Sequence, residues 1–152
     1  MAIDSFSGKY RFLSNFYPSV VIWSSWEWPT VEHAYQAAKS PQDEAYRLAC
    51  YNAETPGAVK RLGQKCKLRP DWEAKKVSIM RDLVEWKFQQ HAELGNKLLA
   101  TGSEELIEGN HWGDVFWGVC RGYGENHLGR ILMAVRTELQ GDRALGLELE
   151  ED

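Results

Sequence analysis

Four helix-start signals in the middle of the chain constrain its fold more than any other feature. Thr30 precedes a helical pattern, Ser40 and Thr55 each precede a proline, and Arg69-Pro70-Asp71 opens another segment. A hydroxyl side chain can cap the first free amides of a helix, and proline is favoured at its first position. The spacing therefore predicts consecutive helices at Val31–Ser40, Pro41–Tyr51, Pro56–Cys66 and from Pro70 to about Gln90.

The remaining segments predict shorter elements. Tyr10–Phe16 and Val20–Trp28 are rich in aromatic and β-branched residues, so we expect strands or irregular chain there, with a turn at Tyr17-Pro18-Ser19. Because helices dominate, the sequence predicts a single compact, mainly helical domain of the α+β class with a few short strands. The further elements expected are a helix at Ala92–Ala100, extended chain with a loop over Leu106–Trp117, and a helix at Glu125–Leu139 capped by Glu125 or Asn126.

The charge of the chain is unevenly distributed. The 152 residues have a formal net charge of −4, and four acids, Glu148, Glu150, Glu151 and Asp152, lie among the last five residues. We therefore expect a domain over residues 1–140 followed by an acidic, flexible tail over 141–152. A basic excess is local and is either a solvated helix surface or a rim that attracts a phosphate-bearing ligand. Its members are Lys60, Arg61, Lys65, Lys67, Arg69, Lys75 and Lys76.

Several classes of protein are disfavoured by the composition. The three cysteines and four histidines are scattered, with no spacing typical of a zinc site or a disulfide framework. No apolar run reaches the roughly 18 residues of a membrane span, and the N-terminus lacks the apolar core of a signal peptide. Phosphate-loop, dinucleotide-binding, zinc-protease and serine-hydrolase motifs are absent from the sequence. We expect a cytoplasmic protein without a metal site or a membrane partner.

The predicted helix at Val31–Ser40 carries the first candidate site. Glu32, Tyr35, Gln36 and Lys39 fall within an arc of about 100° at helical spacing. Exposed Glu and Lys are common on helices, so this arc is either a solvated surface or a functional polar face. The opposite sector offers no broad apolar face, and tryptophans flank the segment. Both observations argue against a fully solvated surface, and the spacing alone leaves the two alternatives open.

Two tryptophans provide further candidates. Asp114 lies three residues before Trp117 in a glycine-rich loop. Asp114 is either a reactive carboxylate beside an aromatic ring or a turn residue that bonds local amides. Trp86 lies at the margin of the apolar face of the 70–90 helix, where it is either the edge of the core or a surface on which a base stacks.

Taken together, these segments resemble the NADAR family, named for a proposed link to NAD and ADP-ribose. The resemblance covers residues 6–139 in order and without large gaps. The matching stretches are Phe12-Leu-Ser-Asn15-Phe16-Tyr-Pro18, Glu32-His-Ala-Tyr35-Gln-Ala-Ala-Lys39, Lys60-x-x-Gly63, Met80 to Phe88, Leu98-Leu99-x-Thr101-Gly102, Leu106-Ile-Glu108, Asp114-x-x-Trp117-Gly118 and Asn126-x-Leu-Gly129-Arg-Ile-Leu-Met133.

The resemblance implies a hydrolase of N-glycosyl bonds that cleaves at C1 of a phosphorylated ribose and needs no cofactor. Its expected substrates are ribosylaminopyrimidine intermediates of riboflavin synthesis or ADP-ribose on guanine bases, the latter also within nucleic acid. Glu32, Lys39 and Asp114 are the candidate catalytic residues. Either Lys39 attacks the ring-opened sugar with Glu32 as proton shuttle, or the carboxylates stabilise an oxocarbenium ion and activate water.

The expected substrate-binding residues include aromatic rings for stacking, an amide for a polar edge and a cation for phosphate. They are Arg11, Asn15, Phe16, Tyr35, Trp86, Trp117 and Asn126. Trp72 and Trp112 are expected to pack in the core, whereas the resemblance assigns no role to Trp23, Trp26 and Trp28. The alternatives to an enzyme are a non-catalytic module that binds ADP-ribose or a nucleotide, and an interaction domain that uses the tryptophan-rich surface.

Overall fold

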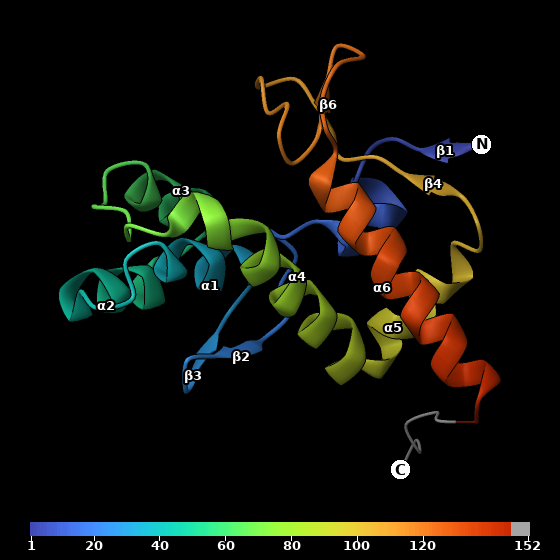
Figure 1. The fold of residues 1–152 in the computed structure, drawn as a ribbon, viewed down its shortest axis with the longest axis horizontal. Coiled ribbons are helices and arrows are strands. Elements are labelled where there is room, and N and C mark those ends of the chain that lie inside the picture. Colours follow the sequence, from blue (N-terminus) through green and yellow to red (C-terminus); the bar gives the residue numbers. More distant parts are fainter. Residues whose placement is uncertain (147–152) are drawn as a thin grey trace. The chain divides into compact units, whose positions relative to one another are not determined.

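The computed structural model describes residues 1–146 and is mainly helical with short two-stranded sheets (Figure 1). This confirms the predicted α+β class. The described chain divides into two compact units. We call residues 15–87 the middle unit, and residues 1–14 together with the chain from Phe88 onward the terminal unit.

Capping side chains set the helix starts of the middle unit. Thr30 accepts a hydrogen bond from the amide of His33 at the start of α1 (Val31–Ala38), and Thr55 accepts one from Ala58 at the start of α3 (Pro56–Gly63). Both predicted caps are thus confirmed. Helix α4 (Trp72–Gln90) begins two residues after Pro70 and ends where the sequence predicts.

The predicted cap at Ser40 is wrong. Helix α2 spans Glu44–Asn52, and its cap is Asp43, which accepts a hydrogen bond from the amide of Tyr46. The amide of Ser40 still donates to Ala37, and the amide of Asp43 donates to Ser40. Residues 40–43 therefore complete a turn between the two helices, and the carboxylate of Asp43 supplies the cap that the hydroxyl of Ser40 does not.

The segment Val20–Trp28, expected as a strand or irregular chain, forms a β-hairpin. Strands β2 (Val21–Trp23) and β3 (Trp26–Trp28) are antiparallel, with Val21 opposite Trp28. Ser24 and Ser25 connect them with φ values of 50° and 69°. Positive φ at both central residues is typical of the tight turn that matches strand twist.

The hairpin packs its tryptophans against α2, which explains the tryptophan-rich segment. Trp28 is buried and donates to the carbonyl of Trp23 over 3.0 Å. The rings of Trp26 and Trp28 stack with centroids 5.5 Å apart, and Tyr51 meets both rings edge-on. The guanidinium of Arg47 lies 4.3 Å from the ring centroid of Trp26.

Helix α1 lies at the centre of the middle unit. Figure 1 shows it beside α2 and α3, and it also contacts both strands of the hairpin. All eight of its residues are buried, including Glu32, His33 and Gln36. The imidazole of His33 bonds the hydroxyl of Thr30 and the carbonyl of Ala53, so its polarity is satisfied within the fold.

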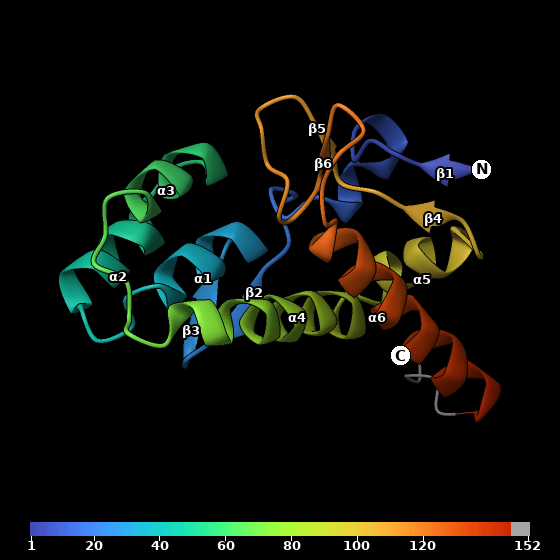
Figure 2. The same cartoon turned by 45° about the horizontal axis from the view of Figure 1, so that its top comes forward.

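The terminal unit is built around its last helix. Helix α6 (His127–Ala144) packs against α5 (Ala92–Ala100) and β4 (Glu105–Leu106), as Figure 2 shows. Strand β4 pairs in parallel with β1 (Ala2–Ile3), and β5 (Gly109–Asn110) pairs in parallel with β6 (Val119–Cys120).

Two predicted boundaries in the terminal unit differ from the structure. Helix α6 continues past Leu139 to Ala144, so the expected start of the tail at residue 141 falls inside a helix, while residues 147–152 lie outside the described residues. The segment Tyr10–Phe16, expected as a strand or irregular chain, instead begins within a 3-10 helix, η1 (Gly8–Leu13). That turn buries the adjacent side chains of Phe12 and Leu13, which a strand would point to opposite faces.

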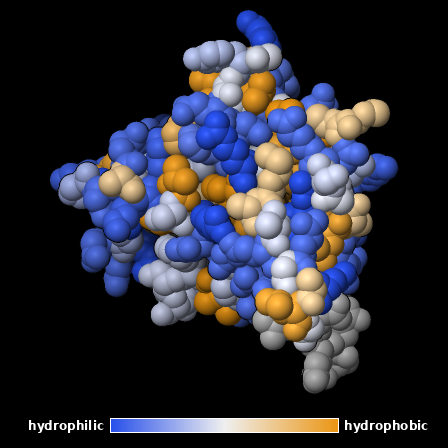
Figure 3. Space-filling view, turned by 45° about the vertical axis from the view of Figure 1, so that its right-hand side comes forward, coloured by the Kyte–Doolittle hydropathy of each residue, from blue (hydrophilic) through white to orange (hydrophobic). Residues whose placement is uncertain are grey.

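The surface carries scattered apolar side chains. On the face drawn in Figure 3, hydrophobic residues occur in small groups among hydrophilic ones. Trp112 is 56% exposed, so the expectation that it packs in the core is wrong, whereas Trp72 is buried as expected. Among residues 1–146, no helix has the length and apolar character needed to cross a membrane.

Candidate active site

The polar face of α1 is an interior surface. Glu32 and Gln36 are 6% and 3% exposed, which rules out the solvated alternative. The side-chain nitrogen Nε2 of Gln36 donates to Oε1 of Glu32 over 2.7 Å. The backbone amide of Glu32 donates to the carbonyl of Asn15 over 3.1 Å. The carboxylate is therefore held at a fixed place on the helix.

Lys39 is the C-cap residue of α1 and is half-buried. Its Nζ lies 5.7 Å from the ring centroid of Tyr35, and that ring lies 5.2 Å from the ring of Trp72. Burial lowers the pKa of Lys39 below its ordinary value and outweighs the opposing effect of the negative charge of Glu32. Glu32, Tyr35, Gln36 and Lys39 thus lie on one face of α1 and its C-terminal end, as the helical spacing predicts.

Helices α2, α3 and α4 and the segment that follows α3 add groups around Lys39 that the helical spacing could not identify. Lys60 on α3 and Lys76 on α4 also lower the pKa of Lys39, because their positive charges oppose its protonation, whereas Cys66 acts in the opposite sense. The hydroxyl of Tyr46 donates to the carbonyl of Gln36 over 2.7 Å. Burial raises the pKa of Tyr46 and that of Cys50, so both side chains hold their protons at neutral pH.

Gly63 allows α3 to approach this face of α1 closely. A Cβ atom at position 63 would lie 2.7 Å from Cδ of Gln36 and 3.3 Å from Nζ of Lys39, and it would overlap Oε1 of Gln36. That oxygen is buried and has no hydrogen-bond donor among the described residues. It is therefore an acceptor that a ligand N–H or O–H could use. In the sequence, only the Lys60-x-x-Gly63 motif indicated that Gly63 belongs to the site.

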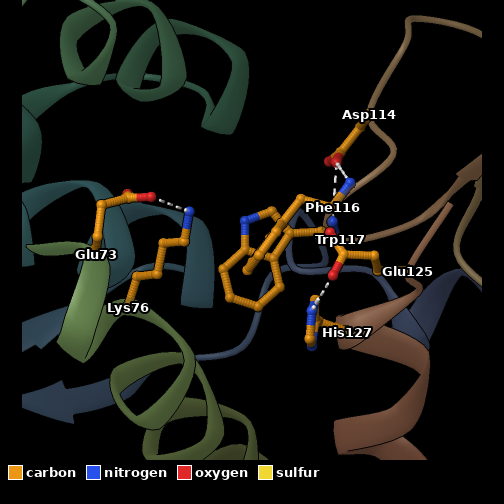
Figure 4. A network of polar contacts seen from close by, with 7 residues as sticks. All are labelled: Glu73, Lys76, Asp114, Phe116, Trp117, Glu125 and His127. Carbon is orange, nitrogen blue, oxygen red and sulfur yellow. Dashed lines mark hydrogen bonds and ion pairs between the residues drawn. The ribbon is translucent and has the colours of Figure 1, made fainter.

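The predicted basic cluster is partly neutralised by ion pairs. Arg69 bonds Asp71 through two nitrogens, at 2.5 Å and 3.0 Å, and this pair lies at the surface. Nζ of Lys76 lies 3.1 Å from Glu73, as drawn in Figure 4. Lys60 and Lys76 are the members of the cluster whose charges act on Lys39.

Asp114 organises a turn in the terminal unit (Figure 4). Its Oδ1 accepts hydrogen bonds from the amides of Phe116 and Trp117, at 3.1 Å and 2.9 Å. The side chain of Asn110 bonds the backbone of Asp114 in both directions. Figure 4 also shows His127 bonded to Glu125, and the ring of His127 lies 4.3 Å from that of Phe116. The bonds from Asp114 to the two amides are those expected of a turn residue, the second alternative given for it above.

The other predicted binding residues are placed as follows. Phe16 is exposed, Trp86 is half-buried on α4, and Nδ2 of Asn15 points to the sulfur of Met80 at 3.4 Å. Arg11 is exposed on η1 in the terminal unit. Asn126 is 9% exposed; its side chain donates to the carbonyl of Leu106 and accepts from the amide of Glu108. Both ends of the Asn126 amide thus hold backbone segments together.

Metal-ligand side chains are not clustered in the part of the chain that the structure describes. No group of three or more His, Cys, Asp or Glu side chains there could hold a metal ion. The carboxylate of Glu32, the amide of Gln36 and the amine of Lys39 form a set suited to proton transfer and nucleophilic attack.

The comparisons with known proteins show the family of the chain. Residues 4–140 match the NADAR domain family. The chain is 42% identical to an N-glycosidase of Nostoc punctiforme over 86% of each chain, and 38% identical to the N-glycosidase YbiA of Escherichia coli over 89% of this chain and 85% of YbiA. A riboflavin biosynthesis protein of Vibrio vulnificus is 44% identical over 87% of this chain, which spans only 36% of that longer protein.

A solved structure has the same fold. The NMR structure of E. coli YbiA aligns with a TM-score of 0.82 at 34% sequence identity, over 99% of this chain and 92% of that one. The chain belongs to the NADAR family. Relatives named N-glycosidases, matched over most of both chains, support the same class for this protein, a hydrolase acting on N-glycosyl bonds.

Proposed function

We propose that this protein hydrolyses the C1–N bond of a phosphorylated ribosyl group, with Lys39 as nucleophile and Glu32 as proton shuttle. The observation that carries this proposal is the half-buried amine of Lys39, whose pKa is lowered by burial beside a fixed carboxylate. A lysine attacks carbon only as the neutral amine, so the lowered pKa increases the reactive fraction near neutral pH.

The proposed reaction begins with opening of the ribose ring, which leaves C1 joined to the base nitrogen as an imine. The neutral amine of Lys39 adds to C1, and the C1–N bond to the base then breaks. Glu32 takes the proton that the amine loses and passes a proton to the departing base nitrogen. Water next adds to C1 of the lysine imine and releases the free sugar, which restores the amine. The net reaction consumes one water molecule per bond cleaved.

The charges around Lys39 support a substrate that carries phosphate. Lys60 and Lys76 act on Lys39 as positive charges from two different helices, and the ammonium of a lysine binds phosphate as a point charge. An aromatic pair also lies near Lys39. The Nζ of Lys39 is 5.7 Å from the ring centroid of Tyr35, and the ring of Tyr35 contacts that of Trp72. We propose ribosylaminopyrimidine phosphates or ADP-ribose on guanine as the substrates.

The test measures sugar release from two substrates, a ribosylaminopyrimidine phosphate and an ADP-ribosylated guanine oligonucleotide. Wild-type protein is expected to release sugar from at least one of them, and Lys39→Ala to lose at least about a hundredfold in rate. Borohydride reduction during turnover is expected to trap sugar on wild-type protein and none on Lys39→Ala. Circular dichroism of both proteins shows whether the variant keeps its fold.

The outcomes separate the alternatives. Sugar release without a borohydride adduct would assign catalysis to carboxylate-activated water and overturn the role of Lys39. Binding of ADP-ribose without release from either substrate would overturn the enzyme and favour a non-catalytic binding module. A Glu32→Gln variant distinguishes these further, because a binding module tolerates it whereas the enzyme loses turnover and keeps its ligand.

A further inference from the structure

The side-chain amide of Gln36 and the adjacent Gly63 belong to the candidate site but have no role in the proposed reaction. Gln36 is as deeply buried as the carboxylate that it bonds, at 3% exposure against 6% for Glu32. If its amide were turned over, an oxygen would face the carboxylate, so the donation from Nε2 to Glu32 fixes the orientation of the amide. Its other end then lies against Gly63 of α3.

The backbone conformation at position 63 does not require a glycine. Gly63 is the last residue of α3 and belongs to the helix, whereas the glycines of the chain with positive φ lie elsewhere. A side chain at position 63 would occupy space that the amide of Gln36 already fills. Its Cβ would overlap the amide oxygen of Gln36 and lie 3.3 Å from Nζ of Lys39. Because Gly63 has no side chain, the amide of Gln36 can occupy this volume.

The consequence concerns Glu32 and Lys39. A buried carboxylate needs hydrogen-bond donors or an opposite charge. Gln36 supplies a neutral donor to Glu32, whereas Lys39 is a cation close enough for the charge of Glu32 to affect it. Removal of the amide takes one neutral donor away from the carboxylate and so strengthens its pairing with the ammonium of Lys39, and a paired ammonium does not attack carbon.

We infer that Gln36 and Gly63 are positioning residues: Gly63 makes room for the amide of Gln36, and that amide holds Glu32 away from a tight ion pair with Lys39, which keeps Lys39 available as the nucleophile. This inference rests on the proposed function of Lys39. The charged and titratable groups that act on Lys39 are Glu32 on its own helix and, from the neighbouring elements, Lys60, Lys76, Cys66 and Cys50.

The chain offers a matched control for this inference. Gly57 lies on the same helix α3, and a Cβ there would meet Arg61 and Thr55 at 3.7 Å and 3.9 Å, which is ordinary contact. Gly57→Ala and Gly63→Ala are therefore the same substitution in the same helix, and only the second displaces Gln36. Gln36→Ala removes the amide without introducing any overlap.

The first measurement is steady-state kinetics of Gly63→Ala, Gln36→Ala and the double variant. We expect each single variant to lose at least about tenfold in kcat with a smaller change in KM, because the substrate is still bound. The double variant is expected to be no slower than either single one, since Gly63 acts only through Gln36. Gly57→Ala is expected to match the wild type. Losses that multiply in the double variant would overturn the inference.

The second measurement needs no substrate. Labelling of Lys39 with acetic anhydride as a function of pH, read by mass spectrometry, gives the midpoint at which the amine becomes neutral. We expect Gly63→Ala and Gln36→Ala to raise that midpoint by about one pH unit or more, as pairing with an opposite charge does, and Gly57→Ala to leave it unchanged. An unchanged midpoint in Gln36→Ala would overturn the inference.

These two readouts distinguish the inference from the proposed function. If wild-type protein releases no sugar and forms no borohydride adduct, the proposed function fails, and the labelling midpoints still decide whether Gln36 and Gly63 keep Lys39 neutral. If wild-type protein is active and the midpoints do not move, only the inference fails. Should Gly63→Ala not fold by circular dichroism, Gln36→Ala carries the test, because it adds no atoms to the interior.

Discussion

The backbone amide of Trp117 donates to Oδ1 of Asp114 over 2.9 Å, and the same oxygen accepts the amide of Phe116. Asp114→Ala removes both bonds, and we expect it to lower the free energy of unfolding by about 1–2 kcal/mol. Asp114→Asn keeps an oxygen acceptor at this place and is expected to retain most of that stability. Urea unfolding of the three proteins measures the difference.

Activity of the same two variants decides between the alternatives for Asp114. A turn residue predicts that Asp114→Asn, once shown to be folded, turns over substrate within a few-fold of the wild type, because an amide oxygen caps the turn as a carboxylate does. A catalytic carboxylate predicts a loss of at least about a hundredfold in Asp114→Asn. The bonds to Phe116 and Trp117 favour the first result.

The lowered pKa of Lys39 has a direct consequence for the pH dependence of the reaction. The reactive form is the neutral amine, whose fraction rises with pH and levels off above the pKa. Because burial lowers that pKa, we expect the rate of borohydride trapping to level off below pH 10.5, the ordinary value for lysine. Glu32→Gln removes the charge that raises the pKa, so its midpoint is expected at a still lower pH. A midpoint at 10.5 or above in the wild type would contradict this assignment.

The aromatic cluster on the hairpin is expected to serve stability and not turnover. Arg47 covers the ring of Trp26 at 4.3 Å and also donates to the carbonyl of Ser24 over 3.2 Å. We expect Arg47→Met to lower the free energy of unfolding by about 0.5–1 kcal/mol, the usual size of an exposed cation–π contact. Thermal unfolding measures this loss, and kcat for sugar release is expected to stay the same. A large fall in kcat with unchanged stability would place this cluster in the functional site.

Local signals predicted those parts of the fold that depend on a few neighbouring residues. Thr30 and Thr55 cap their helices because each hydroxyl lies within reach of the backbone amide three residues further on. The same rule failed at Ser40 because Asp43, three residues further on, offered a competing cap. The turn at Ser24-Ser25 carries none of the usual Asn-Gly signature, so the hairpin was not predictable from the sequence pattern.

The candidate site shows the same division. Glu32, Gln36 and Lys39 share a helix, so helical spacing alone places them on one face. Tyr46, Gly63 and Cys66 reach that face from α2, from α3 and from the segment that follows it, and no spacing rule connects residues on separate helices. The expectation for Asn126 depended on its motif, while its buried amide bonds two backbone groups about twenty residues away.

Lys87 lies on α4 with 1% of its surface exposed, and its Nζ is 5.7 Å from the ring centroid of Tyr17. Burial lowers its pKa to about 7. Between that value and the ordinary pKa of 10.5, the unfolded chain binds a proton that the folded protein does not. Stability therefore rises with pH across this window, and the full cost of burying the amine is present below pH 7.

Lys87→Met removes this cost, so we expect it to raise the free energy of unfolding relative to the wild type most strongly at pH 6, by up to about 4 kcal/mol. The gain is expected to shrink as the pH rises and to fall below about 1 kcal/mol at pH 10. Urea unfolding of both proteins at pH 6, 8 and 10 measures it. Lys75→Met makes the same substitution at an exposed position of the same helix and serves as the control for replacing a lysine of α4 by methionine. A gain for Lys87→Met that stays constant from pH 6 to pH 10 would show that Lys87 titrates alike in the folded and unfolded protein.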